Sequence, residues 1–267
     1  MYVVFMVAGM SSRYGGRLKQ LAKVGINGET LIEVSVEQAF SAPFTKLIFI
    51  TNENTEHDFV SIFGDEWKGI PVMYVRQEWN KDERDRPWGT TSAVCSLKGK
   101  IDEPFIVVNS DDLYGAKTFQ KGYNLLNTTK NNIIGGCLLE KTMPVIEETV
   151  VNRGVIDIDK ESGNVVKIEE MLGISAKTHP QLLEKLASVN FVGLRPQTLK
   201  YLEAILDDFK IQHTDNRKAE SLLPTDLNYL IQNELISINY FEIENSVYGI
   251  TYPGDEKHVK LVVSLYG

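Results

Sequence analysis

The stretch YVVFMVAG, residues 2–9, decides the fold of this chain. Six consecutive apolar residues indicate a strand that is buried on both faces of a parallel sheet, and the glycine ends it. Similar β-branched or aromatic runs follow at residues 46–51, 71–75 and 105–108. Segments with helical spacing separate them at 31–40 and 56–63, and residues 89–94 indicate a helix start that their hydroxyls can cap. This alternation is typical of βαβ units. It predicts an α/β fold, Rossmann-like, with a mixed and mostly parallel sheet flanked by helices.

From residue 132 onward the pattern shifts towards strands. We find no internal repeat, no low-complexity tract and no Pro/Ser-rich linker, so we expect a single domain, residues 1–267, with a smaller elaboration in its second half. Strands are expected at 133–139, 149–152, 155–159, 165–169, 188–194 and 236–243, with a hairpin turn at 161–164. Helices are expected at 180–187, 196–208, 224–233 and 253–265.

The composition excludes several classes of protein. The chain has 28 Lys+Arg against 36 Asp+Glu, a net charge of −8, and no sustained basic run, which argues against nucleic acid as a partner. It has no run of about 18 apolar residues and no basic leader, so we expect no membrane partner and a cytoplasmic location. Cys95 and Cys137 lack the spacing of a metal site and are expected to be reduced thiols.

The loop after the first strand combines flexible backbone with positive charge. Glycines and serines let several backbone N–H groups converge on an anion, and three cations lie within seven residues. The loop could therefore cradle a triphosphate, or it could be a solvated turn with ordinary surface cations. It is neither a P-loop nor a G-x-G-x-x-G fingerprint. Its residues are Ala8, Gly9, Ser11, Ser12, Arg13, Gly15, Gly16, Arg17 and Lys19.

Two carboxylates, Asp111 and Asp112, follow the apolar run at 105–108. Open α/β sheets bind ligands beyond the carboxyl ends of their strands, and oxygen ligands suit Mg²⁺ bound to nucleotide phosphates. The alternative is that these acids close a turn and cap a helix that begins near Gly115. We predict metal binding for Asp111 and helix capping for Asp112. The mixed-charge run at 82–86 predicts a solvated loop.

Several segments together resemble the sugar-phosphate nucleotidyltransferase family. The loop at 8–13 with Lys19 resembles the family's G-x-G-[ST]-R signature, residues 84–93 resemble its Gly-Thr segment over the nucleobase, and residues 108–115 resemble its metal-binding strand end. Further matches follow the family's order and extend the resemblance over nearly the whole chain. They are residues 153–155, 168–170, 189–193 and 248–253.

The resemblance implies Mg²⁺-dependent transfer of a nucleotidyl group from a nucleoside triphosphate to a sugar 1-phosphate, with release of pyrophosphate. The nucleotide would bind residues 1–135 and the sugar phosphate residues 136–267. Asp111 would hold Mg²⁺, Arg13 would grip the pyrophosphate and Lys19 would approach the attacking phosphate. UTP or dTTP is favoured, because a glutamine after a strand can pair with the uracil edge. The nucleotide-binding residues would be Ala8, Gly9, Ser11, Ser12, Gln77, Gly89 and Thr90, and the acceptor would meet Glu170 and Asn190.

The chain departs from the family pattern in four places. Ser11 and Thr91 replace common glycines, Arg17 is an apparent insertion, and a long segment separates Gln77 from Gly89. In addition, residues 248–252 lack the second metal-binding Asp that many members carry. The metal would then be held by Asp111, phosphates and water, or catalysis would be weakened.

Two other functions fit the same residues. A glycosyltransferase of the same fold would also use a strand-end aspartate with a divalent metal, but it has less reason to carry the cationic loop. A non-catalytic nucleotide- or sugar-phosphate-binding protein would keep the fold and lose the second acid.

Overall fold

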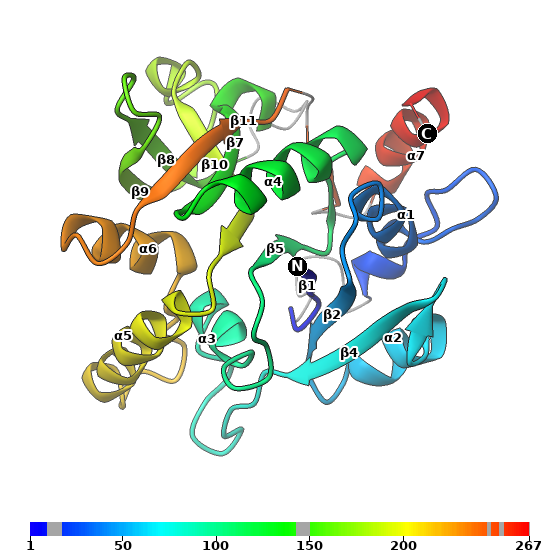
Figure 1. Cartoon of the computed structure of the whole chain (residues 1–267), viewed down its shortest axis with the longest axis horizontal. Helices are drawn as coiled ribbons and strands as arrows, with labels where there is room; N and C mark the ends of the chain where they lie inside the picture. The colour runs from blue at the N-terminus through cyan, green and yellow to red at the C-terminus, as the bar shows by residue number, and fades with distance from the viewer. Residues whose placement is uncertain (10–17, 143–149, 245–246, 251–253, 267) are drawn as a thin grey trace.

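The computed structural model describes residues 1–9, 18–142, 150–244, 247–250 and 254–266 (Figure 1). A ten-stranded mixed sheet lies at the centre, and a separate pair of short strands joins two distant segments. The strands are β1 Tyr2–Met6, β2 Lys46–Thr51, β3 Glu66–Trp67, β4 Ile70–Arg76, β5 Phe105–Asn109, β6 Asp112–Leu113, β7 Asn132–Leu138, β8 Val151–Ile158, β9 Val165–Ile174, β10 Leu186–Leu194, β11 Ile238–Glu242 and β12 Tyr248–Gly249.

The main sheet has the order β11-β7-β10-β5-β1-β2-β4-β3, and β8 and β9 extend it from β10. Strands β5, β1, β2 and β4 are parallel, so Met6, Ile50, Val75 and Asn109 lie at one level. Ala8, Gln77 and Asp111 therefore emerge from the same edge of the sheet, as the sequence predicts. The predicted fold class, a mixed and mostly parallel α/β sheet, is confirmed.

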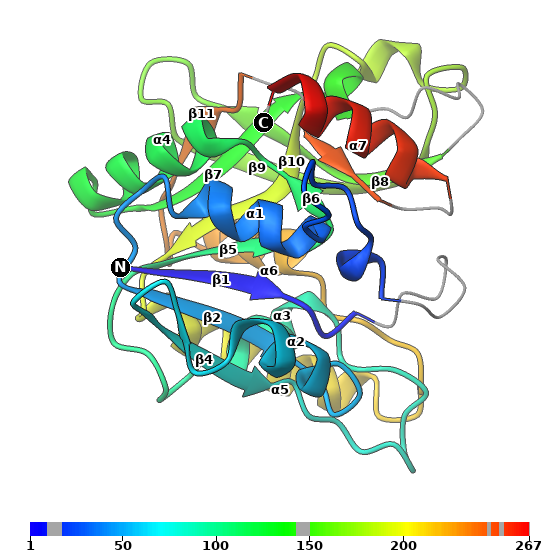
Figure 2. The same cartoon turned by 90° about the vertical axis from the view of Figure 1, so that its right-hand side faces the viewer.

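Helices cover both faces of the sheet (Figure 2). Helices α1, α2 and α4 pack on one face, whereas α3, α5 and α6 pack on the other. The helical segments are η2 Lys19–Leu21, α1 Leu31–Ala39, α2 Glu56–Phe63, α3 Thr90–Cys95, α4 Ala116–Thr128, η3 Leu139–Thr142, η4 Pro180–Leu182, α5 Thr198–Gln212, α6 Leu223–Gln232 and α7 Asp255–Tyr266. None of these helices is long and apolar enough to span a membrane.

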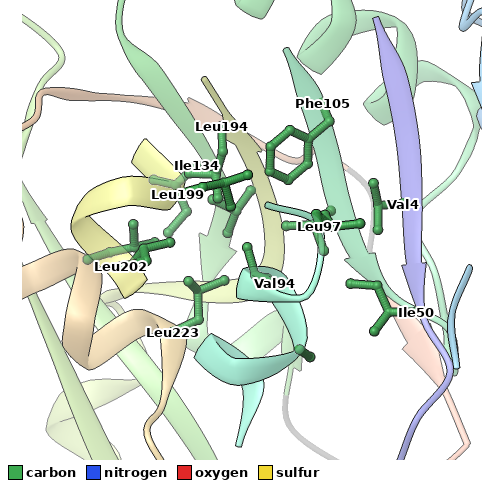
Figure 3. Packing of buried hydrophobic residues seen from close by; sticks show 14 of the residues in the cluster. Val4, Ile50, Val94, Leu97, Phe105, Ile134, Leu194, Leu199, Leu202 and Leu223 are labelled. Atoms are coloured by element: carbon green, nitrogen blue, oxygen red, sulfur yellow. The ribbon is translucent and has the colours of Figure 1, made fainter. Parts of the chain in front are cut away.

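The apolar core explains why the central strands read as continuous hydrophobic runs. Side chains on alternate positions of β1 enter the two opposite clusters, so both of its faces are buried. Figure 3 shows one of these clusters, where residues from α3, α5 and α6 meet residues from the strands. The labelled residues are Val4, Ile50, Val94, Leu97, Phe105, Ile134, Leu194, Leu199, Leu202 and Leu223.

Two sequence-based predictions in the second half are wrong. The strands expected at 149–152 and 155–159 form one strand, β8, with an irregular register between Val151 and Arg153. The helix expected at 180–187 is a single short turn, and β10 begins at Leu186. Ala187 pairs with Cys137 on one side and Val155 on the other, so sheet pairing prevails over helical spacing.

Candidate active site

An ion pair joins the two catalytic candidates that the structure describes. Lys19 Nζ donates to Asp111 Oδ2, and both side chains are about one-fifth exposed, at 21 %. The turn that carries Lys19 is tied to the strand ends, because Gln20 Nε2 donates to Ser110 Oγ at 3.1 Å and Ser110 Oγ donates to Met6 O at 2.6 Å. The sequence correctly places Lys19 and Asp111 at one site. Ser11, Ser12, Arg13 and Arg17 lie outside the described residues.

Asp112 does not cap the following helix, which corrects the sequence-based prediction. Helix α4 begins after Gly115 without a side-chain cap. Asp112 instead belongs to β6, and its Oδ2 accepts from Asn109 Nδ2 at 3.0 Å, with the Tyr114 hydroxyl at 3.5 Å. Strand pairing with β12 turns its side chain away from the helix start. Burial and the neighbouring Asp111 raise the pKa of Asp112 to about 6.

The C-terminal stretch that lacks a family acid lies directly against the two aspartates. Gly249 pairs with Asp112, and Ile250 N donates to Asp111 O at 3.0 Å. A Cβ added at Gly249 would lie 2.1 Å from Asp112 Oδ1, so this position excludes a side chain. Among the described residues, no cluster of three or more His, Cys, Asp or Glu side chains could hold a metal. The Asp111 side chain is 21 % exposed, and the carboxylate beside it in the sequence is that of Asp112.

The structure brings Gln77 and Gly89 together despite the long segment between them. The Gln77 side chain is 5 % exposed, and its Nε2 donates to Gly89 O at 2.9 Å. Gly89 has a φ of +93°, and a Cβ added there would lie 2.3 Å from Ser221 O. Only glycine suits this backbone conformation and this close approach. Gln77 and Gly89, both of which the sequence assigns to nucleotide binding, therefore lie in direct contact.

The segment between Gln77 and Gly89 is anchored by a buried arginine rather than fully solvated. Arg84 is 4 % exposed, and its guanidinium donates to the carbonyls of Arg86, Asn216 and Ala219. Its Cζ lies 3.2 Å from the centre of the Trp88 ring, and burial lowers its pKa. The prediction of a solvated loop at 82–86 is therefore wrong for Arg84, which has three carbonyl partners across the chain.

Thr90 caps a helix, but not the one that it begins. The sequence places hydroxyl capping at the start of α3, where the structure shows no side-chain cap. Thr90 Oγ1 instead accepts from Leu223 N at 2.9 Å, in the first turn of α6. At the other end of the site, Ala8 O accepts from Asn52 Nδ2 at 2.7 Å, and Gly9 is exposed with open space around its Cα.

The acceptor-side candidates lie on β9 and β10, two strands that β8 separates. Glu170 is half-buried opposite Gly154, and burial raises the pKa of its carboxyl. Asn190 has a φ of +59°, a costly conformation for a residue with a side chain, at the irregularity of β10. Tyr114 joins this side to the aspartates, because its hydroxyl donates to Val189 O at 2.8 Å and accepts from Asn109 N at 3.2 Å.

Sequence reasoning assigned no role to Tyr114 or to Arg153. Arg153 Nη1 and Nη2 donate to the carbonyls of Asn152 and Thr142, at 2.9 and 3.3 Å, and its buried Nε has no partner among the described residues. Its positive charge opposes the rise in the pKa of both Asp112 and Glu170. In a sequence, neither a tyrosine after an acidic pair nor an arginine in a strand is by itself enough to indicate a functional residue.

Comparison with known proteins identifies the family. A model of the nucleotidyl transferase family matches residues 16–171, more than half of the chain. The chain belongs to the nucleotidyl transferase family. The matched region of this nucleotidyl transferase includes Lys19, Gln77, Gly89, Asp111 and Glu170. The predicted class of enzyme is confirmed at that level. A search of curated proteins found no match.

Solved structures share the fold of this nucleotidyl transferase over nearly its whole length. A UDP-glucose pyrophosphorylase in complex with UDP-glucose has a TM-score of 0.71 at 17% identity, covering 99% of this chain and 98% of its own. A proposed glucose-1-phosphate thymidylyltransferase from Bacillus anthracis has a TM-score of 0.70 at 14% identity, covering 98% and 95%. The inositol-1-phosphate CTP transferase from T. maritima has 0.68 at 11% identity, covering 98% and 94%.

Proposed function

We propose that this nucleotidyl transferase joins UTP or dTTP to a sugar 1-phosphate and releases pyrophosphate, with Mg²⁺ as cofactor. The observation that carries this proposal is the placement of the Lys19–Asp111 pair and the Gln77–Gly89 pair at one edge of the sheet. A triphosphate that spans these two pairs would have its base at Gln77 and its phosphates at Lys19.

The chemistry needs orientation and charge neutralisation more than proton transfer. An acceptor phosphate oxygen attacks the α-phosphorus, and the bond from that phosphorus to the β-phosphate oxygen breaks. The attacking oxygen is already an anion, so no general base is required. Lys19 binds and orients the acceptor phosphate, while Arg13 binds the departing pyrophosphate. These assignments follow from the charges of the side chains and the resemblance to the family.

The donor set at Asp111 fits a magnesium ion that retains other oxygen ligands. Mg²⁺ is commonly bound by one or two carboxylates together with substrate phosphates and water. The Asp111 side chain is 21 % exposed and its Oδ2 accepts from Lys19. Asp112 Oδ2 accepts from Asn109, and burial raises the pKa of Asp112 to about 6. We therefore assign Asp111 as the protein's ligand. When bound, the ion would neutralise phosphate charge near the α-phosphorus.

The preference for uracil or thymine rests on the amide of Gln77. The carbonyl of Gly89 can only accept, so the side-chain NH₂ of Gln77 must face it. Within the described residues, Gln77 Oε1 receives no hydrogen bond and can accept from the N3–H of uracil or thymine. The names of two similar structures involve thymidine or uridine nucleotides, whereas the third is a CTP transferase. Ala8, Gly9, Ser11, Ser12 and Thr90 would complete the nucleotide site.

The acceptor would bind in the second half of the domain. Glu170 and Asn190 offer an acid and an amide for hydroxyl groups. Asn190 lies on β10, which pairs with β5, and Glu170 lies on β9, which β8 connects to β10. We accordingly divide the single domain into a nucleotide half, residues 1–135, and an acceptor half, residues 136–267. The names of similar structures include glucose-1-phosphate and inositol-1-phosphate enzymes, so the proposed acceptor class is a sugar or cyclitol 1-phosphate.

One observation favours a second candidate, a non-catalytic binding protein. The stretch from Tyr248 to Ile250 contacts the aspartates and contributes no carboxylate. An assay of pyrophosphate release with a panel of triphosphates and sugar 1-phosphates separates the two functions. Release that requires both substrates and Mg²⁺ supports the transferase. Binding of a triphosphate without any release supports the binding protein, and release of a nucleoside diphosphate from a nucleotide sugar would indicate a glycosyltransferase.

A further inference from the structure

Asp226, in the first half of α6, holds two hydroxyl groups from different parts of the chain. Its side chain is buried, at 6 % exposure, and its Oδ2 accepts from both Thr91 Oγ1 and Ser221 Oγ. Thr91 lies 135 residues earlier in the sequence, in α3. A single oxygen therefore ties the start of α3 to the residues that precede α6.

The same region of α6 fixes the turn that contains Gly89. Ser221 N donates to Trp88 O at 2.8 Å, and Thr91 N donates to Ser221 O at 3.2 Å, so Ser221 pairs with both sides of Gly89. Thr90 Oγ1 adds the bond to Leu223 N described above. The approach leaves no room for a Cβ at Gly89. The position of Gly89, and of the carbonyl that orients Gln77, thus depends on the α6 start.

Helix α6 also contacts the strands that carry the acceptor-side candidate. A Cβ added at Gly154 would lie 3.3 Å from Pro224 Cβ and 3.4 Å from Glu170 Oε2. Asn228 Oδ1 accepts from Ile168 N at 2.8 Å, two residues before Glu170. One helix is therefore packed against the proposed base-binding turn and against the proposed acceptor-binding strands.

We propose that Asp226 is a positioning residue that holds the Gly89 turn in register with α6, and through α6 with the Glu170 strands. This inference rests on the proposed function for the roles of Gly89 and Glu170. Loss of the two bonds to Oδ2 removes the side-chain tie between Ser221 and Thr91, so that the backbone bond from Thr91 N to Ser221 O alone joins them directly. The Gly89 carbonyl then moves relative to Gln77, and a small misplacement of a binding group is costly for recognition.

Three variants separate positioning from general stability. Asp226→Ala removes the acceptor of both hydroxyls, whereas Asp226→Asn keeps one oxygen that can accept from both. Asn132→Ala is the matched control, because Asn132 Oδ1 is a buried oxygen that accepts from Arg195 N at 2.9 Å and Thr198 Oγ1 at 3.0 Å. Those bonds tie β7 to the start of α5 and involve none of the proposed nucleotide- or acceptor-binding residues. If Asp226→Ala does not fold, Thr91→Val removes one of the two donors instead.

Two measurements test the proposal on the full chain. The first is amide hydrogen exchange of residues 88–94, which needs no ligand. The second is the dissociation constant, by calorimetry with Mg²⁺, of whichever of ATP, GTP, CTP, UTP and dTTP binds the unaltered protein most tightly. For Asp226→Ala we expect exchange and the dissociation constant each to rise about 10-fold or more. Asp226→Asn should stay within about 3-fold. Asn132→Ala should lower the denaturant midpoint about as much as Asp226→Ala does. It should change neither the exchange of residues 88–94 nor the dissociation constant of the nucleotide.

The outcomes distinguish this inference from the proposed function. Unchanged exchange and affinity in Asp226→Ala would overturn the positioning role, as would an equal effect of Asn132→Ala. A wild-type protein that binds a triphosphate but releases no pyrophosphate contradicts the proposed function and leaves these comparisons intact. If the wild-type protein binds no triphosphate, the exchange measurement decides the positioning role alone.

Discussion

Replacement of Gln77 by leucine should abolish discrimination between UTP and CTP. Cytosine has an unprotonated N3, so Gln77 could serve it only with its amide reversed. Reversal would break the 2.9 Å bond from Nε2 to Gly89 O and place two acceptor oxygens against each other. A lost bond and an unsatisfied buried group together cost about 1.4–3 kcal/mol. Wild-type protein should therefore bind UTP about 10- to 150-fold more tightly than CTP.

Calorimetric titration with UTP and CTP in the presence of Mg²⁺ measures this ratio directly. In Gln77→Leu both nucleotides should bind weakly, and the ratio of their dissociation constants should be near one, because leucine offers neither donor nor acceptor. Gln38→Leu is the control, since Gln38 Oε1 also bonds a glycine backbone, Gly115 N at 2.9 Å, away from the base site. Its UTP:CTP ratio should match that of the wild-type protein. Equal affinity for UTP and CTP in the wild type, tighter binding of ATP or GTP, or a ratio preserved in Gln77→Leu, would refute the role given to Gln77.

Three further predictions concern the charged groups. Asp111→Asn should lower turnover about 100-fold or more, since a metal clamp supplies several kcal/mol, and full Mg²⁺-dependent activity in this variant would contradict the assignment. Arg13→Ala and Lys19→Ala should each lower kcat/KM more than Arg17→Ala does, and a larger effect of Arg17 would show that the loop register is wrong. The pKa of Asp112 is about 6 in the folded protein against a reference value of 3.8, so between these pH values the carboxyl takes up a proton on folding. Its contribution to the free energy of unfolding therefore falls as the pH rises from about 4 to 6. Asp112→Asn should therefore raise the free energy of unfolding by on the order of 1–3 kcal/mol at pH 7.5 and little at pH 4, and urea titrations that show an equal effect at both pH values would contradict this.

The first half of the fold was predictable because its signals are local. The strand at 46–51 and the helix at 56–63 match the sequence-based bounds to the residue. Buried parallel strands give uninterrupted apolar runs, and the intervening helices give clear helical spacing. The prediction of a helix at 180–187 is wrong because the pairing of residues 186–187 with two other strands outweighs their local helical propensity.

The candidate site could be predicted where its residues follow strand ends. Gln77 and Asp111 leave parallel strands at one edge, so topology alone brings both to the same edge of the sheet. Arg84 and Asp226 could not be found in this way, because each has a partner more than 130 residues away in the sequence. A buried arginine within a charged run and an aspartate within a helix have the sequence appearance of surface residues.

Phosphorus NMR of the reaction mixture tests the central claim most directly. The protein is incubated with Mg²⁺, UTP or dTTP, and a panel of sugar and cyclitol 1-phosphates, and the products are identified by their phosphorus signals. We predict the pyrophosphate signal together with the paired signals of a nucleoside diphosphate sugar, in equal amounts, and neither signal in the absence of the acceptor. Unchanged UTP and dTTP with every acceptor, or hydrolysis to a nucleoside diphosphate and inorganic phosphate, would contradict nucleotidyl transfer to a sugar 1-phosphate.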